Sequence, residues 1–93
     1  MYEGILRRMR DLVLDQQYVM TYPARQEMNE DRLSIFDVEQ GVITGEVVER
    51  QRDRVTGGWK YRILGETIEG DSMELVARFS FSGRVVVLTV YTL

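Results

Sequence analysis

The sequence has no cysteine, no histidine and only one proline among its 93 residues. Without cysteine there can be no disulfide and no thiolate chemistry, which is typical of cytoplasmic proteins and leads us to expect that location. Without cysteine and histidine, neither a Cys/His zinc site nor a Ser-His-Asp or Cys-His nucleophilic centre can form. Any acid–base chemistry would therefore use Glu, Asp, Lys, Tyr or Arg, and we expect no metal and no cofactor.

Long hydrophobic runs are also missing. No apolar stretch approaches the roughly 20 residues that a membrane-spanning helix needs. The first amphipathic segment contains Asp11 and Asp15, which is not the composition of a signal or transit peptide, so we expect no membrane association. With 93 residues, 44% of them hydrophobic, the chain can bury one core and predicts a single domain, 1–93.

Neither sign of charge dominates the chain as a whole. The net charge of −3 argues against a broad electrostatic affinity for nucleic acid. The charge is unevenly spread, however, because residues 47–64 contain five basic side chains and only two acidic ones, Glu49 and Asp53. A local basic surface is therefore predicted on an acidic protein.

The first half of the sequence predicts three helices, at about 2–17, 23–31 and 34–44. The first has apolar residues at helical spacing on one side. The second begins with Pro23, which suits a first helical turn. The third has Ser34 as an N-cap, Asp37 in its first turn and Gly45 as its stop. Residues 18–22 are predicted to be extended.

From Glu46 the apolar pattern changes to a period of two. Four strands are predicted, at 47–55, 59–68, 72–81 and 84–92, joined by turns rich in glycine. Turn-forming pairs between alternating apolar runs favour antiparallel hairpins. The sequence thus predicts an α+β fold with three N-terminal helices packed on one face of a four-stranded antiparallel sheet.

The alternation along the strands separates an apolar face from a basic one. The third strand places only apolar residues on one side, which predicts the core: Met73, Leu75, Ala77, Phe79 and Phe81. If the apolar sets of all strands coincide, the basic residues gather on the exposed face: Arg50, Arg52, Arg54, Lys60, Arg62 and Arg78. Such a face can be a solvated surface, a surface for RNA or another anion, or a docking site for an acidic protein segment. Trp59 is expected in the core.

The last strand is apolar on both faces between Val85 and Val90. Exposing such a strand is unfavourable by about 25 cal/mol per Å² of apolar surface. It is therefore predicted to be either the central strand or an edge covered by a second copy, which would make the protein a homodimer. Acidic residues around Asp71 lack the spacing of a calcium loop and are interpreted as a solvated turn.

Several segments carry a resemblance to a known family. They run in order along nearly the whole chain: Ala24–Met28, Leu33–Val38, Gly45–Glu49, Trp59-Lys60-Tyr61, Gly65, Gly70 and Leu88–Tyr91. In this order and spacing they resemble the bacterial domain-of-unknown-function 4258 family. The chain departs from the family at Pro23, because the family usually has a histidine at that position.

The resemblance implies a fold akin to RelE-like and MqsR-like toxins. It also implies pairing with a small zinc-finger antitoxin of the YgiT or MqsA type. Such toxins cleave messenger RNA without a metal, so the protein is interpreted as a possible endoribonuclease toxin. A non-catalytic interaction module and an anion- or small-ligand-binding protein are the alternatives.

Metal-independent RNA cleavage needs a base, an acid and cations that stabilise the phosphorane. Arg62 and Arg78 are the candidates for binding phosphate, and Lys60 or Tyr91 for moving protons. These four residues form the predicted catalytic set. Arg50, Arg52 and Arg54 are the predicted RNA-binding residues.

Overall fold

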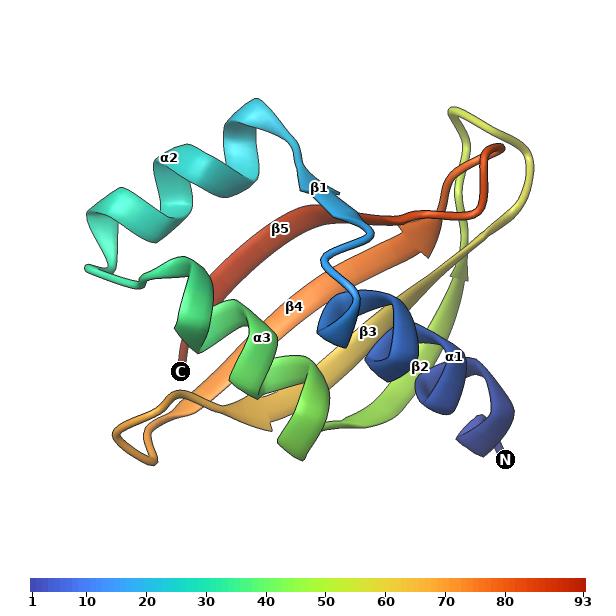
Figure 1. Cartoon of the computed structure of the whole chain (residues 1–93). Helices are drawn as coiled ribbons and strands as arrows, with labels where there is room; N and C mark the ends of the chain where they lie inside the picture. The colour runs from blue at the N-terminus through green and yellow to red at the C-terminus, as the bar shows by residue number, and fades with distance from the viewer.

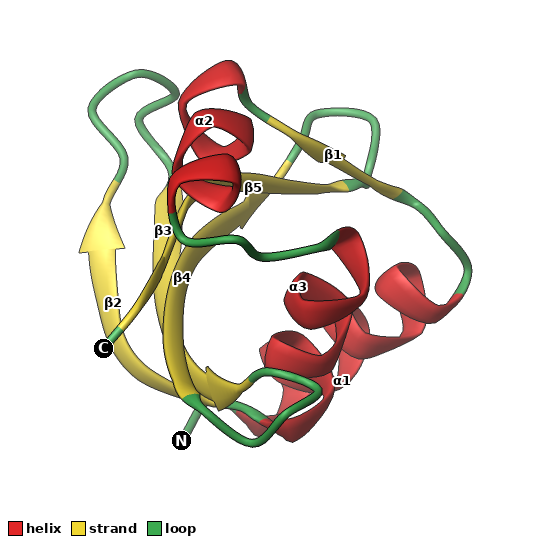
Figure 2. Ribbon diagram, turned by 90° about the vertical axis from the view of Figure 1, so that its left-hand side faces the viewer, coloured by secondary structure: helices red, strands yellow, loops and turns green.

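The computed structural model describes all 93 residues and contains three helices and a five-stranded sheet. The elements are α1 (Glu3–Leu14), β1 (Tyr18–Met20), α2 (Tyr22–Glu30), α3 (Ile35–Thr44), β2 (Glu46–Arg52), β3 (Trp59–Glu66), β4 (Ser72–Phe79) and β5 (Val85–Thr92). The strands lie in the order β1-β5-β4-β3-β2. Helices α1 and α3 lie over one face of the sheet, and α2 lies beside β5 (Figures 1 and 2). The predicted α+β class with three helices is confirmed.

The prediction of four antiparallel strands is wrong in both number and direction. Residues Tyr18–Met20 form an additional strand, β1, which pairs in parallel with Val85–Val87 of β5. The remaining neighbours pair antiparallel. The extended segment was predicted, but a strand of three residues has no pattern that reveals its distant partner. Its place in the sheet depends on a contact across most of the chain.

Helix α3 begins at its predicted cap, Ser34. Ser34 and Asp37 form a reciprocal capping box at α3, in which the Ser34 hydroxyl accepts from the Asp37 N–H and the Asp37 carboxylate accepts from the Ser34 N–H. The Thr21 side chain caps α2, with Pro23 in its first turn. Helix α1 ends at Leu14, three residues before its predicted end, and Gln16 then has a φ of +59°.

The core lies between the three helices and the sheet. Met73, Leu75 and Ala77 are fully buried, as predicted. Helix α3 approaches the sheet closely at Gly41, because a Cβ at Gly65 of β3 would lie only 2.1 Å from the Gly41 carbonyl oxygen. The two glycines therefore set the distance between helix and sheet. The predicted burial of Phe81 is wrong, since β4 ends at Phe79 and Phe81 lies fully exposed in the following turn.

Strand β5 lies inside the sheet but not at its centre, which is β4, so it matches neither predicted position as stated. It pairs with β4 on one side and with β1 on the other. Where β1 ends, side chains of α2 and its flanks bind the edge of β5. The Val90 N–H donates to the Glu27 carboxylate over 3.2 Å, and the Thr92 N–H donates to Asp31 over 2.9 Å. The apolar strand is thus covered within one chain. None of the three helices has the length and apolar character that crossing a membrane requires.

Candidate nucleic-acid interface

A β-bulge in β2 decides on which face its arginines lie. The pairing of β2 with β3 shifts by one residue between Val47 and Glu49. Beyond the bulge Arg50 lies opposite Tyr61 and Arg52 opposite Trp59. Directly paired residues share a face, so both arginines lie on the face that α1 and α3 partly cover. One extra residue inverts the alternation, so the predicted grouping of these arginines with Lys60, Arg62 and Arg78 on one exposed face is wrong.

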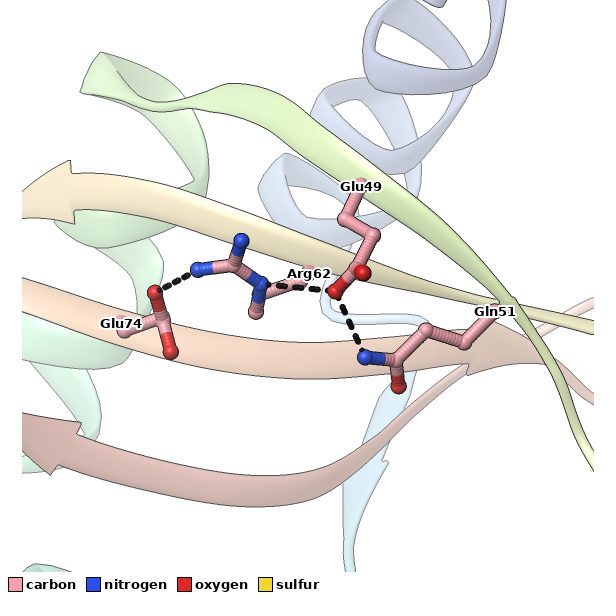
Figure 3. A network of polar contacts seen from close by, with 4 residues as sticks. All are labelled: Glu49, Gln51, Arg62 and Glu74. Carbon is pink, nitrogen blue, oxygen red and sulfur yellow. Dashed lines mark hydrogen bonds and ion pairs between the residues drawn. The ribbon is translucent and has the colours of Figure 1, made fainter.

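Arg62 lies on the opposite, open face and is held between two carboxylates. Its Nε donates to Glu49 over 3.0 Å and its Nη1 donates to Glu74 over 2.6 Å. Gln51 donates to the same Glu49 oxygen, which completes the network in Figure 3. The hydrogen bonds from Gln51 and then Arg62 lower the pKa of Glu49, and those to Glu74 and Glu49 raise the pKa of Arg62. Arg62 is therefore occupied by its neighbours and is not available to bind phosphate.

Arg78 is also in an ion pair. Its Nε lies 3.2 Å from the carboxylate of Asp53, which is buried where β2 leads into its hairpin loop. The same carboxylate accepts hydrogen bonds from the Val55 N–H and the Thr56 hydroxyl. Burial opposes ionisation of Asp53, but these hydrogen bonds and the charges of Arg78 and Lys60 outweigh it and lower its pKa. Arg78 therefore anchors the loop between β2 and β3.

Lys60 and Tyr91, the other two members of the predicted catalytic set, lie apart from each other. Lys60 and Tyr91 take part in no side-chain hydrogen bond or salt bridge. Tyr91 pairs with Glu74, which pairs with Leu64, four residues beyond Lys60 on β3. The two Cα atoms are thus separated by about 13 Å along the strands and about 10 Å across them. Lys60, Arg62 and Arg78 do share the open face of β3 and β4, but both arginines are in ion pairs and Tyr91 lies apart from the other three.

The hairpin of β2 and β3 instead forms a cluster around Trp59. The guanidinium carbons of Arg50 and Arg52 lie 3.9 and 4.0 Å from the centroid of the Trp59 ring. These are cation–π contacts, which hold the guanidinium planes near the aromatic ring. Trp59 is 38% exposed, so its predicted burial is wrong. It follows the apolar alternation of β3, but it lies at the end of the strand, among exposed arginines.

The arginines of this hairpin carry charge that no carboxylate neutralises. The two acidic residues of the segment, Glu49 and Asp53, pair with Arg62 and Arg78. Arg50, Arg52 and Arg54 are exposed and form no salt bridge, although Arg52 Nη1 donates to the Gly57 carbonyl over 2.9 Å. We call Arg50, Arg52, Arg54 and Trp59 the hairpin surface. It contains all three predicted RNA-binding residues and one aromatic residue that sequence reasoning assigned to the core.

A signal for Trp59 was present in the sequence. Residues that flank a hairpin turn pair across it, and Arg52 and Trp59 flank the loop that contains Gly57-Gly58. Pairing the strands outward from that loop places Trp59 beside Arg52 before any burial is considered. Alternation along a single strand assigns a face, but it does not show how far the helices extend over that face.

The acidic residues form no metal site. A pocket of about 490 Å³ lies between the α2–α3 connection and the β3–β4 turn. Its acidic residues are Asp31, Asp37, Glu69 and Asp71. Asp31 and Asp37 are bound to backbone N–H groups of Thr92 and of Ser34 and Ile68. No group of three or more carboxylates in the chain is arranged to hold a metal ion.

Comparison with known proteins identifies the family but not the activity. The model of the domain of unknown function DUF4258 matches residues 20–92, so the chain belongs to this family. The match begins within β1 and covers every element after it, and α1 lies outside. No curated protein and no solved structure matches the chain.

Proposed function

We propose that this member of the DUF4258 family binds single-stranded RNA through the hairpin surface. The observation that supports the proposal is the pair of guanidinium groups within 4.0 Å of a half-exposed tryptophan ring, with no carboxylate bound to either. Arginines contact phosphates, and unpaired bases stack on aromatic rings or on guanidinium planes. The hairpin surface offers both contacts within a few residues.

The aromatic ring is the reason to expect single strands. The bases of a duplex are stacked on one another, so their faces cannot reach Trp59. An unpaired base has a free face, and its stacking on an aromatic side chain contributes about 1–3 kcal/mol. The acidic net charge of the protein also limits binding that depends on phosphates alone.

The test is fluorescence anisotropy with a labelled, unstructured ten-nucleotide RNA at several salt concentrations. Three phosphate contacts at the hairpin surface contribute about −2 to the slope of log K against log salt. Trp59 is the only tryptophan, so quenching of its fluorescence reports stacking at this site. The double variant Arg50→Gln, Arg52→Gln should lose at least tenfold in affinity and flatten the slope.

The matched control removes two arginines from another surface. Arg25 and Arg32 are exposed on and after α2, so Arg25→Gln, Arg32→Gln changes the net charge equally. It should leave the affinity within twofold of the unaltered protein. Equal losses in the two double variants would show that only net charge matters, and no binding by the unaltered protein would refute the proposal. Duplex RNA of equal length should bind more weakly.

We further propose, as a second candidate, that the protein is the RNA-cleaving toxin of a toxin–antitoxin pair with a RelE-like fold. This rests on the sequence resemblance, and Lys60, an open-face cation without a salt bridge, supports it. Cleavage of a labelled RNA by the purified protein in chelator, abolished by Lys60→Ala, would support it. Growth arrest on expression, relieved by a zinc-finger antitoxin of the YgiT or MqsA type, would identify the partner. Intact RNA and normal growth favour a non-catalytic binding module.

A further inference from the structure

We infer that the bound RNA strand continues from the hairpin surface to Arg8 of α1, which provides a second contact point. This rests on the proposed RNA binding and adds a residue from an element outside the family match. Arg8 was not among the predicted site residues. Its role follows from its position over an aromatic ring on the same face of the sheet as Trp59.

Arg8 repeats the arrangement found at Trp59. Its guanidinium carbon lies 4.2 Å from the centroid of the Phe79 ring at the end of β4. Arg8 is exposed, and its side chain takes part in no hydrogen bond or salt bridge. Three arginines of the chain therefore lie over aromatic rings, and none of the three has a carboxylate partner.

The two stacked positions are joined by one aromatic residue. Tyr61 lies two residues after Trp59 on β3, which puts their Cα atoms about 7 Å apart on one face. The Tyr61 ring lies 6.5 Å from the Phe79 ring, edge to face. Tyr61 itself is buried, so the surface route runs beside it. Two residues beyond the Tyr61–Ala77 pair, Trp59 of β3 and Phe79 of β4 come opposite each other, about 5 Å apart across the strands. A strand bound at Trp59 has a short way to reach Arg8.

Stacking prepares the Arg8 guanidinium for a ligand. The guanidinium lies over the Phe79 ring, and the residue is exposed, so solvent reaches the group. A base can stack on the guanidinium plane, or a phosphate can accept two N–H bonds. Because the side chain is already held by the ring, little conformational entropy is lost when RNA binds. An arginine that served packing alone would leave RNA affinity unchanged when it is replaced.

The experiment measures the affinity of RNAs of two lengths for the unaltered protein and for variants at position 8. Ten-nucleotide and two-nucleotide RNAs are titrated into the full chain, with Trp59 fluorescence as the readout for both. Arg8→Gln should lower the affinity for the ten-nucleotide RNA about fivefold or more. It should also reduce the magnitude of the salt slope by about 0.7. The two-nucleotide RNA covers only the hairpin surface, so its affinity should change less than twofold. Arg8→Lys, which keeps the charge but loses the planar stack, should show an intermediate loss.

The control is Arg7→Gln, which removes a charge from the neighbouring exposed position of α1 without a stacked ring. If Arg7→Gln and Arg8→Gln lower the affinity for the ten-nucleotide RNA equally, α1 contributes only through its net charge. The inference is then wrong. It is also wrong if Arg8→Gln weakens both RNAs equally, because the hairpin surface is then disturbed. If no RNA quenches the Trp59 fluorescence of the unaltered protein, the proposed function itself is refuted.

Discussion

At the scale of single residues, the charged side chains of this chain divide into occupied and free groups. Arg62 and Arg78 are paired with carboxylates on the open face, whereas Arg50 and Arg52 lie over Trp59 on the other. Residue type alone predicted both sets as RNA ligands. What distinguishes them is pairing, which depends on the register of β2 against β3 and on one bulged residue.

Replacement of Arg62 should separate stability from binding. Arg62→Ala leaves Glu74, whose side chain is only 7% exposed, without its cation. An unpaired buried carboxylate is destabilising, so the melting temperature should fall, and adding Glu74→Leu should restore part of it. RNA affinity at a temperature where both proteins are folded should be unchanged. If Arg62→Ala lowers the RNA affinity at a temperature where both proteins are folded, Arg62 contacts RNA and the assignment is wrong.

The capping residue Asp37 should make stability depend on pH. The hydrogen bond from the Ser34 N–H, aided by the bond from Ile68, lowers the pKa of Asp37 below its ordinary value. A lowered folded-state pKa contributes stability above the unfolded value of about 3.9, which is lost as pH falls through the folded pKa. The difference in melting temperature between the unaltered protein and Asp37→Asn should be largest near neutral pH and disappear in acid. A difference that grows in acid would contradict this assignment.

At the scale of elements, the sequence predicted the features that depend on neighbouring residues and missed those that depend on residues far apart in the chain. The cap at Ser34, the place of Pro23 in a first helical turn, the helix order and the four main strands follow from patterns within a few residues. The β1–β5 pair and the bulge in β2 do not, because each depends on a partner elsewhere in the sheet. The extent of helix coverage over Trp59 is non-local in the same way. The bulge and the extent of helix coverage determine the candidate site.

Two glycines should respond oppositely to replacement by alanine. A Cβ at Gly65 would lie 2.1 Å from the Gly41 carbonyl oxygen, so Gly65→Ala must push α3 away from β3. Overpacking of this kind destabilises by about 1–3 kcal/mol. Gly4 in α1 has open space around it, and Gly4→Ala should stabilise by up to about 1 kcal/mol. Urea unfolding of both variants measures the two effects, and a neutral Gly65→Ala would show that the helix can shift freely.

At the scale of the whole molecule, the sheet covers its most apolar strand within the chain. A homodimer was predicted as one way to cover the last strand. No second chain is needed for this, because β1 and α2 occupy the edge of β5. The remaining long edge is β2, which carries charged residues and a bulge. Both features oppose edge-to-edge pairing. Light scattering should therefore report a monomer.

The cover of β5 can be removed without touching the core. Glu27 accepts hydrogen bonds from the Val90 N–H and the Thr89 hydroxyl, and Asp31 accepts them from the Thr92 N–H and hydroxyl. Glu27 is half-buried on α2, and Asp31 is exposed at its end. In the double variant Glu27→Ala, Asp31→Ala the N–H groups of Val90 and Thr92 and the hydroxyls of Thr89 and Thr92 lose their side-chain acceptors. The edge of an apolar strand is then opened. A loss of about 1–3 kcal/mol in unfolding free energy is expected, together with dimers or larger species by light scattering. Glu30→Ala, on the same helix and without a hydrogen bond to β5, is the matched control and should remain a stable monomer. If the double variant is as stable and as monomeric as the control, the chain does not depend on α2 to cover this edge, and the two-fold dimer regains its place as the alternative.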